Sequence, residues 1–496
     1  MYNQINSDAL TKAGRFSLSD VTLTSYQSAD GSNLPKRIGV RSLVVEINIY
    51  ESIYSKGLSG NIVLVDGLNI ANHLPLTGFE RVEFKLATPG VAKGYDFTPE
   101  TGHPMFIYKI SGRKGIAPRT QMYVLHFCSK EMIDNEQIKV KQAYSGTIDE
   151  AVIDIFRNKL QSKKTLIVEE TRGVRKYVMP RLKPFNAIDL MAKEAESKRF
   201  NNAGMLFYED AVGYRFRSLE NMLAITEGSA RPVVGKFQMK PRSIKGGSGV
   251  TNIIEEMQTV DAYSILSQYD TLKNLSNGVY ASRTITHDQF NKTFEEIDFD
   301  YHNFYQSIFH TEHDGNGGKT DNKGQLPLFN YKNNKFFSDF AEGTEYAFST
   351  TSNIHNDYEY PDYGRTIPKR LAQRLSFASM NISLDARGFT GISAGDLCSF
   401  EMPSYEPAGG DNPLNYDPYM SGRYLVKAIR HKIDTSKDLH TMNLECMKDA
   451  VRKPYPEESI DTFTDRENTE RLNVIQDQLD DLTIKGANEE TNTMLT

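Results

Sequence analysis

The group of side chains best suited to bind a metal lies in a polar segment of this 496-residue chain. It contains three histidines and two acidic residues: His302, His310, Glu312, His313 and Asp314. Imidazole and carboxylate groups together are good ligands for zinc or iron. Their spacing matches no established ligand pattern, and the sequence HDGNGGKTDNKG that begins at His313 is typical of a solvated loop. We therefore interpret these histidines as polar loop residues, and we predict no metal site.

Two pairs of adjacent acidic residues could supply the acid and the base of glycoside hydrolysis. They are Glu255–Glu256 and Glu295–Glu296. Neighbouring residues on a strand point to opposite faces, which favours ordinary surface charges. Ser248 lies between glycines, but the Gly-x-Ser-x-Gly spacing of a nucleophile elbow is absent, as is a His-Glu-x-x-His motif. The sequence thus predicts no catalytic residue and no bound cofactor.

The composition describes a soluble globular protein that is rich in β-structure. Hydrophobic residues make up 39% and charged residues 25%, and 26 Phe and 26 Tyr occur without any Trp. No apolar run is long enough to span a membrane, and the first residues lack the features of a secretion signal. The three cysteines, Cys128, Cys398 and Cys446, are too few for a disulfide framework and suggest buried thiols in a reducing cytosol.

The net charge of −6 is distributed unevenly along the chain. Residues 454–496 hold 11 acidic and 3 basic residues, which leaves about +2 for the remainder. The body of the protein therefore lacks the basic excess that drives nucleic-acid binding.

Residues 14–135 are predicted to form a first β-domain. Apolar and polar residues alternate along 43–50, 62–65 and 82–86, as expected of half-buried strands. A hairpin over 105–128 closes the domain.

Residues 136–245 are predicted to form a small α+β domain. Thr147 and Glu150 have the spacing of a capping box at a helix start. A second helix follows Pro184, and a hairpin spans 205–216. The sequence Lys245–Gly249 that follows lacks the ending of a phosphate-binding loop and is interpreted as a flexible hinge.

A second β-domain is predicted over 246–300 and 369–452, split by an insert over 301–368. The segment 299–363 contains 8 Phe and 7 Tyr among 65 residues. These aromatic residues could stack on sugars, but packing within the insert or anchoring a protein interface is the preferred interpretation.

The acidic tail, 453–496, carries a short apolar stripe at helical spacing. Its residues are Leu472, Ile475, Leu479 and Leu482. Two heptads are too few for an autonomous coiled coil, so the stripe favours a helix that docks on a partner over a disordered solubilising extension.

Two hairpin segments, 107–133 and 425–451, look like copies of one element. Without gaps they share four identities: Lys109/Lys427, Lys114/Lys432, Cys128/Cys446 and Lys130/Lys448. Thr77-Gly78 and Thr390-Gly391, upstream of each hairpin, form a second echo. We predict a duplication, with Cys128 and Cys446 at equivalent interior positions. Two similar β-domains per chain would allow three subunits to form a ring with six-fold-like symmetry.

One stretch of the first β-domain resembles a known family. The residues are Glu51-Ser52-Ile53-Tyr54, then Gly57 and Gly60, then a strand ending at Asp66, and then Gly78-Phe79-Glu80. They resemble the first domain of the baseplate central hub proteins of contractile-tailed phages of the T-even type. The domain order is also similar, so the resemblance covers most of 14–451. The length of the insert and the acidic tail depart from that pattern.

The resemblance implies a mainly β fold with two similar antiparallel, tube-type β-barrel domains, one of them split by the insert. It also implies a non-enzymatic homotrimer whose ring joins the hexameric tail tube to the trimeric central spike. The implied partners are the central spike protein, the tail tube or a tube-initiator protein, and baseplate wedge proteins. DNA would pass through the lumen without specific binding. The expected location is the virion tail baseplate, assembled in the host cytoplasm.

Related hubs occur in phage-like bacteriocins and in type VI secretion spikes, so the resemblance also fits other contractile injection devices. Two alternative functions would use the aromatic insert. One is a baseplate-associated hydrolase of polysaccharide or cell wall, and the other is a host-receptor-binding protein.

Overall fold

The computed structural model describes most of the chain between residues 12 and 452. The described residues are 12–25, 36–74, 76–78, 80–101, 103–200, 202–226, 229–239, 253–288, 291–312, 340–350, 363–404, 416–417 and 419–452. The hinge expected at 245–249 and the apolar stripe of the tail lie outside the described residues, as do His313 and Asp314. None of the helices in these ranges combines the length and the apolar character that crossing a membrane requires.

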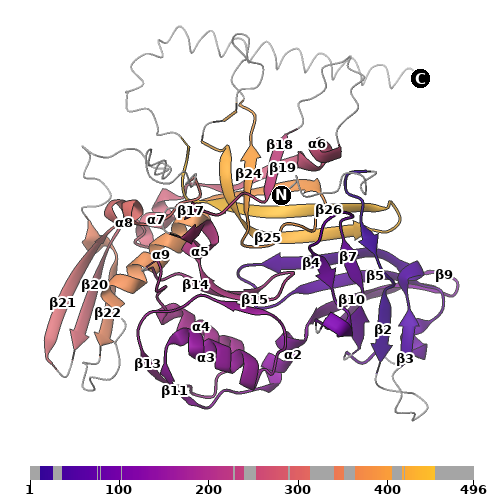
Figure 1. Cartoon of the computed structure of the whole chain (residues 1–496), viewed down its shortest axis with the longest axis horizontal. Coiled ribbons are helices and arrows are strands. Elements are labelled where there is room, and N and C mark those ends of the chain that lie inside the picture. Colours follow the sequence, from indigo (N-terminus) through magenta and orange to yellow (C-terminus); the bar gives the residue numbers. More distant parts are fainter. Residues whose placement is uncertain are drawn as a thin grey trace, which may run out of the picture. The chain divides into compact units, whose positions relative to one another are not determined.

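The fold is mainly β, as expected, and half of the strands in the described residues belong to one 13-stranded sheet (Figure 1). Seven strands from the first 130 residues form one part of this sheet and are all antiparallel to their neighbours. In spatial order they are β3 (Lys36–Gly39), β2 (Thr22–Ser25), β6 (Arg81–Glu83), β9 (Met105–Ala117), β10 (Thr120–Ser129), β5 (Ser59–Asp66) and β4 (Val44–Ser52).

Six strands from residues 235–448 form the other part of the sheet. In spatial order they are β25 (Gly422–Asp434), β26 (Leu439–Lys448), β23 (Met380–Arg387), β19 (Thr259–Gln268), β18 (Gly235–Met239) and β24 (Leu397–Glu401). Strand β24 also pairs with β25, so these six strands close into a barrel.

Five strands occur in the same order and direction in both parts. The first five-strand unit is β4-β5-β10-β9-β6, and the second is β19-β23-β26-β25-β24. Every neighbouring pair in both units is antiparallel. The units also share a bulge, which falls between Val44 and Glu46 on β4 and between Val260 and Ala262 on β19. A shared irregularity of this kind marks equivalent positions, because bulges interrupt a ladder at one defined place.

The hairpins of the two units share another bulge, and it corrects the expected alignment. In β9 the ladder skips Tyr108, because Phe127 pairs with Ile107 and His126 pairs with Lys109. In β25 the ladder skips Lys427 in the same way, between its pairings to Cys446 and Glu445. Phe127 is therefore equivalent to Cys446, and Cys128 is equivalent to Met447.

The prediction that Cys128 and Cys446 are equivalent is wrong by one residue. A shift of one position along a strand moves a side chain to the opposite face of the sheet. Cys446 lies in the core of the second unit, with its sulfur 3.6 Å from that of Cys398. Cys128 lies on the other face near Glu209, and burial together with this carboxylate raises the pKa of its thiol to about 12.

The loops that lead into β6 and β24 also have the same structure. Thr77 is equivalent to Ser393, which lies three residues after the Thr390 expected from the repeated Thr-Gly pair. The amide of Thr77 donates to Glu80 Oε1 at 2.6 Å, and that of Ser393 donates to Asp396 Oδ2 at 2.9 Å. The carbonyl oxygen of Glu80 then accepts from Ile107 N, and that of Asp396 accepts from the equivalent residue of β25.

The described residues between 130 and 230 contain a small α+β region with its own apolar core. The predicted capping box forms, with Thr147 and Glu150 exchanging side-chain and backbone hydrogen bonds at the start of α3 (Ile148–Asp154). The predicted helix after Pro184 is α4 (Pro184–Glu194), and the predicted hairpin is β14 (Met205–Glu209) with β15 (Tyr214–Ser218). Further elements are α2 (Lys130–Gln137), β11 (Ala143–Gly146), a π-helical turn over Ile155–Lys159, β12 (Leu166–Val168), β13 (Arg175–Val178), α5 (Leu219–Leu223), β16 (Ala224–Thr226) and β17 (Ser229–Ala230).

Residues 253–300 differ from the strands expected there. The segment Ile253–Gln258 forms the helix α6, and Thr271–Ser276 forms the helix α7. Strands β20 (Ala281–Asp288) and β21 (Thr293–Asp300) pair with β22 (Glu345–Thr350) in a separate three-stranded sheet. This sheet lies beside α9 (Tyr363–Ser379) and near α8 (Tyr301–Ser307) in Figure 1. Alternating residues predict a strand but do not identify its partner.

The strand expected over 82–86 is interrupted at Phe84. Its first part is β6 of the large sheet, and its second part is β7 (Lys85–Ala87), which pairs with β1 (Ser17–Leu18) and β8 (Gly94–Asp96) in a small sheet. The helix α1 (Ile70–His73) is a single turn.

Candidate assembly site

The two five-strand units join directly through strands β4 and β25. Seven residue pairs run antiparallel from Ala428 opposite Ser52 to Asp434 opposite Glu46. The ladder continues at both ends, where Ile53 N donates to Lys427 O and Thr435 N donates to Val45 O. The backbone of the first unit is therefore continuous with that of the second, which leaves neither strand with an open edge at this junction.

Side chains alternate across the junction as the strand period requires. Ile47, Ile49 and Ile433 are fully buried on the inner face. On the other face, Arg430 Nε donates to Asn48 Oδ1 at 3.0 Å. Lys432 Nζ lies 3.1 Å from Glu46 Oε2 on that face. The junction thus combines an apolar seam with a charged, partly exposed surface.

Glu51 stands on the inner face of β4 and connects three parts of the chain. Its carboxylate accepts from Tyr95 Oη at 2.7 Å and from the amide of Ala394 at 2.9 Å. Burial, followed by the nearby carboxylate of Asp210, raises the pKa of Glu51 to about 7. Ile47, Ile49 and Glu51 follow a period of two, so an acidic residue on an otherwise apolar face was the signal in the sequence for a buried carboxylate.

A second buried charge cluster ties the α+β region to the first five-strand unit. The ammonium of Lys164 lies 2.6 Å from Glu209 Oε1 and 2.9 Å from Glu131 Oε2, and all three side chains are buried. The other oxygen of Glu209 accepts from the amide of Leu58 and from the hydroxyl of Ser129. Both carboxylates hold the pKa of the ammonium above its ordinary value, despite its burial.

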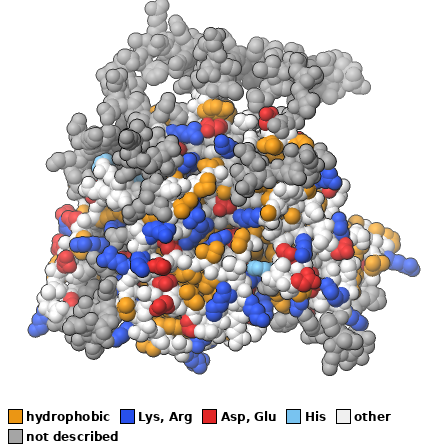
Figure 2. Space-filling model, viewed as in Figure 1, with side chains coloured by type: hydrophobic (Ala, Val, Ile, Leu, Met, Phe, Trp, Pro, Cys, Tyr) orange, Lys and Arg blue, Asp and Glu red, His pale blue; other side chains and the backbone are white. Residues whose placement is uncertain are grey.

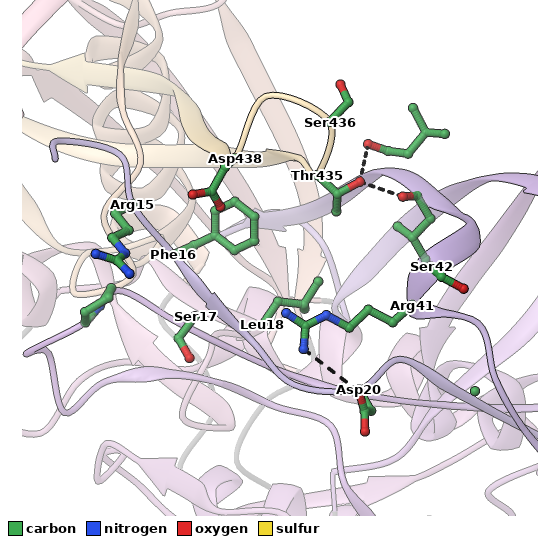
Figure 3. Close-up of a pocket in the computed structure, with 14 residues that line it drawn as sticks. Arg15, Phe16, Ser17, Leu18, Asp20, Arg41, Ser42, Thr435, Ser436 and Asp438 are labelled. Atoms are coloured by element: carbon green, nitrogen blue, oxygen red, sulfur yellow. Dashed lines mark hydrogen bonds and ion pairs between the residues drawn. The ribbon is translucent and has the colours of Figure 1, made fainter. Parts of the chain in front are cut away.

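A cleft of about 1310 Å³ opens beside the junction, between the start of β4 and the β25–β26 turn. Figure 3 shows the turn residues Thr435, Ser436 and Asp438 near one wall, while Arg41 reaches toward Asp20 at the other. The hydroxyl of Thr435 donates to the carbonyl oxygens of Val44 and Val45 and so fixes the turn against β4. The wall residues mix charges of both signs with apolar groups, so they do not define a ligand class.

The structure gives the described candidates for a metal site, His302, His310 and Glu312, different surroundings. His310 is buried. Its Nε2 donates to the carbonyl oxygen of Tyr305 at 2.7 Å, and its Nδ1 lies 2.8 Å from Asp449 Oδ2. His302 is exposed on α8, and Glu312 accepts from the amide of Arg423 on β25. Within the described ranges, no three His, Cys, Asp or Glu side chains gather as metal ligands. His310 instead joins the end of α8 to the end of β26, through an aspartate that sequence reasoning missed.

The two acidic pairs do not face one another as an acid and a base. Glu255 and Glu256 lie on the helix α6, whereas a strand was expected there. Glu295 and Glu296 are adjacent on β21, as expected, and Glu296 lies 3.7 Å from Arg283. Neither arrangement places two carboxylates across a cleft.

The tip of the β9–β10 hairpin lies at the right edge of the molecule in the view of Figures 1 and 2. Hydrophobic and basic side chains are visible there in Figure 2. Ile116 on β9 is 53% exposed. Single exposed hydrophobic residues are common on protein surfaces, so Ile116 does not by itself mark a binding surface.

Comparison with known proteins supports the resemblance seen in the sequence. No protein-family model matches the chain. The chain is 21% identical over 421 residues to a probable baseplate hub protein, gp334, of Vibrio phage KVP40, a match that covers 82% of this chain and 90% of the relative. Among solved structures, a 43 kDa tail protein of prophage MuSo2 from Shewanella oneidensis covers 88% of this chain and 100% of its own, with 10% identity and a TM-score of 0.45.

A tail protein from Neisseria meningitidis MC58 gives a similar result, with 9% identity, a TM-score of 0.44, and coverage of 89% of this chain and 100% of its own. The sequence match to gp334 extends over most of both chains. The resemblance of this chain to the baseplate hub proteins of contractile-tailed phages is therefore confirmed.

Proposed function

We propose that this chain is the structural hub of a phage tail baseplate. In this proposal a homotrimer places six five-strand units around one axis, and the ring joins the hexameric tail tube to the trimeric central spike. Baseplate wedge proteins would surround the ring. DNA would pass through its lumen, and the small net charge of the body agrees with passage without tight binding.

The observation that carries this proposal is the repeated unit and its continuous junction. Two units of the same strand order pair edge to edge within one chain. Each chain therefore already contains one copy of the contact between units. Repeating one contact by rotation produces a closed ring if the rotation closes. Three chains would then provide six similar five-strand units, which matches a six-fold tube. The trimer itself has the three-fold symmetry of a spike. The hub-like relative supports the same role.

The proposed role requires no catalysis. Neither the His302–Glu312 segment nor the acidic pairs form an arrangement suited to hydrolysis in the described residues. We therefore propose a structural protein without enzymatic activity, which acts in the virion tail and is assembled in the host cytoplasm.

Mass measurement in solution tests the oligomer. Light scattering after size-exclusion chromatography is expected to give three times the chain mass of 56.1 kDa. A strict monomer at all accessible concentrations would overturn the ring.

A genetic test addresses the role in the virion. Phage in which the gene is interrupted should produce heads but no complete tails, and the protein supplied from a plasmid should restore them. Normal tails in the absence of the protein would contradict a hub. Hydrolysis of cell-wall or capsule polymers by the purified trimer would favour the enzyme alternative.

A further inference from the structure

We propose that strand β9 of one protomer pairs with strand β19 of a second copy of this chain, in the register of the β4–β25 junction. The inference rests on the proposed ring and identifies the two edges that would close it.

The equivalence follows from the repeated unit. Strand β9 occupies the position of β25, because both precede the second hairpin strand and share the bulge at Tyr108 and Lys427. Strand β19 occupies the position of β4, because the two share the bulge after Val44 and Val260. Since β4 pairs with β25 inside the chain, the same contact between subunits would bring β19 of one copy against β9 of the next.

Over most of their length, the outer edges of β9 and β19 have no partner strand within the described part of the chain. One edge of β25 pairs first with β24, through residues 422–425, and then with β4, through residues 428–434. The corresponding edge of β9 pairs with β6 only at Met105 and Phe106. Strand β19 pairs with β18 only at Thr259 and Val260. Each strand therefore continues for several residues beyond its last partner strand on that side.

Side-chain exposure differs between equivalent positions in the way that a missing partner would produce. Ile49 is fully buried at the junction inside the chain. Ile265, its equivalent on β19, is 39% exposed, and Leu266 beside it is 52% exposed. Pairing with β9 of a second copy would cover these residues. Burial of apolar area at this edge would stabilise the contact by about 25 cal/mol per Å².

The register is defined by two irregularities that compensate each other. From Ser111 to Lys114, β9 takes three steps where β25 takes two, because the ladder to β10 has an extra residue near Gly112. From Ser264 to Ser267, β19 also takes three steps where β4 takes two, because its ladder to β23 has an extra residue at Leu266.

Both strands are therefore longer by one residue over the same section. Residues before and after this section therefore keep the same pairing register. If only one of the two strands had a bulge, the register would shift by one residue. Lys432 is opposite Asn48 inside the chain, so the inferred contact places Lys114 of one copy opposite Ser264 of the next.

Disulfide trapping tests this register directly. The variant that combines Lys114→Cys with Ser264→Cys should form covalent dimers and trimers on a non-reducing gel after mild oxidation. Lys114→Cys alone and Ser264→Cys alone should remain monomeric on the same gel, and an equal mixture of the two single variants should stop at the dimer. The three native cysteines are buried, which limits background cross-linking.

The junction inside the chain provides the matched control. Asn48→Cys with Lys432→Cys places two thiols at the equivalent pair and should close within one chain, without a covalent oligomer. If light scattering gives a trimer and this control closes, but Lys114→Cys with Ser264→Cys does not cross-link, the inferred pairing is wrong while the ring remains. A monomer by light scattering overturns both the pairing and the ring.

A charge placed on the edge gives a second test that does not depend on thiol geometry. Ile265→Asp should raise the dissociation constant of the trimer at least about tenfold, because a charged side chain at an edge opposes strand pairing. Leu272→Asp, at an 82% exposed position on α7 off the edge, should leave it unchanged. Equal trimer stability in both variants would overturn the pairing.

Discussion

Replacing Glu51 with Gln should make the protein more stable at neutral pH and change little at acidic pH. Glu51 is only 2% exposed, at the meeting point of β4, β8 and the loop before β24. Its two hydrogen-bond partners are Tyr95 Oη and the amide of Ala394. A glutamine has nearly the same shape, and it can accept from the amide while it donates to the tyrosine oxygen. The substitution therefore removes the charge and keeps the contacts.

The magnitude follows from the pKa of this carboxyl group. Burial and Asp210 raise it from the ordinary 4.5 to about 7, so the folded protein binds the proton more tightly than the unfolded chain does. The stabilising effect of that proton is complete below about pH 4.5 and is lost as the pH rises through 7. At about 1.4 kcal/mol per pH unit, the loss is about 3 kcal/mol. Glu51→Gln should escape this loss.

Urea unfolding followed by circular dichroism measures the effect. The free energy of the first cooperative transition should be similar for the natural chain and for Glu51→Gln at pH 4.5. It should be higher for the variant by up to about 3 kcal/mol at pH 7.5. Exposed Glu100→Gln is the control and should show no such pH dependence. A difference that stays constant with pH, or that is larger at acidic pH, would refute the assignment of Glu51 as a buried, proton-binding carboxyl group.

Three further substitutions test the buried contacts. His310→Ala should lower the free energy of unfolding by about 3 kcal/mol, because Asp449 loses its buried imidazole partner; a loss below about 1 kcal/mol by urea unfolding would contradict this role. Lys164→Met should cost about 3–5 kcal/mol at pH 8 and less at pH 5, because Glu131, no longer beside the ammonium, can then bind a proton, so an equal cost at both pH values would count against it. Gly60→Ala should lower the melting temperature, because a Cβ would lie 2.2 Å from Phe127 Cζ, whereas Gly39→Ala meets nothing within 4 Å and should not.

Local features of this fold were predictable from local sequence. The Thr147–Glu150 capping box and the 205–216 hairpin depend on residues within a few positions of one another, and both occur where the pattern placed them. The strands at 43–50 and 62–65 were equally clear, because one face of each is apolar. Short-range spacing is sufficient for such elements.

Pairings between distant segments were not predictable in the same way. Strands β20 and β21 alternate like the strands of the large sheet, yet they pair with β22 instead. The hairpin identities Cys128/Cys446 and Lys109/Lys427 align residues that the bulges place one position apart. Of the four identities, only Lys114/Lys432 joins equivalent residues. The extra residue near Gly112 shifts the structural alignment by one position, and at Lys114 this brings it back into agreement with the ungapped sequence alignment. A bulge leaves little trace in one sequence, and it changes which face every later residue occupies.

The buried partners at the assembly site depend on contacts that span most of the chain. Glu51 meets Ala394, and His310 meets Asp449. Only the fold brings these residues together. The placement of Glu51 on an apolar face indicated a buried carboxylate, but nothing near it in the sequence identified its partner.

The junction of β4 with β25 also has a consequence for synthesis of the chain. Ser52 leaves the ribosome 376 residues before its partner Ala428 does. At about 5–20 residues per second, β4 waits about 20 to 75 s for the strand that covers its edge. During that time the completed first unit presents an unpaired strand to other nascent chains, which is a risk for aggregation. Slow translation should therefore lower the soluble yield of this protein more than that of a protein whose strands pair with near neighbours, and a holdase chaperone should offset the loss.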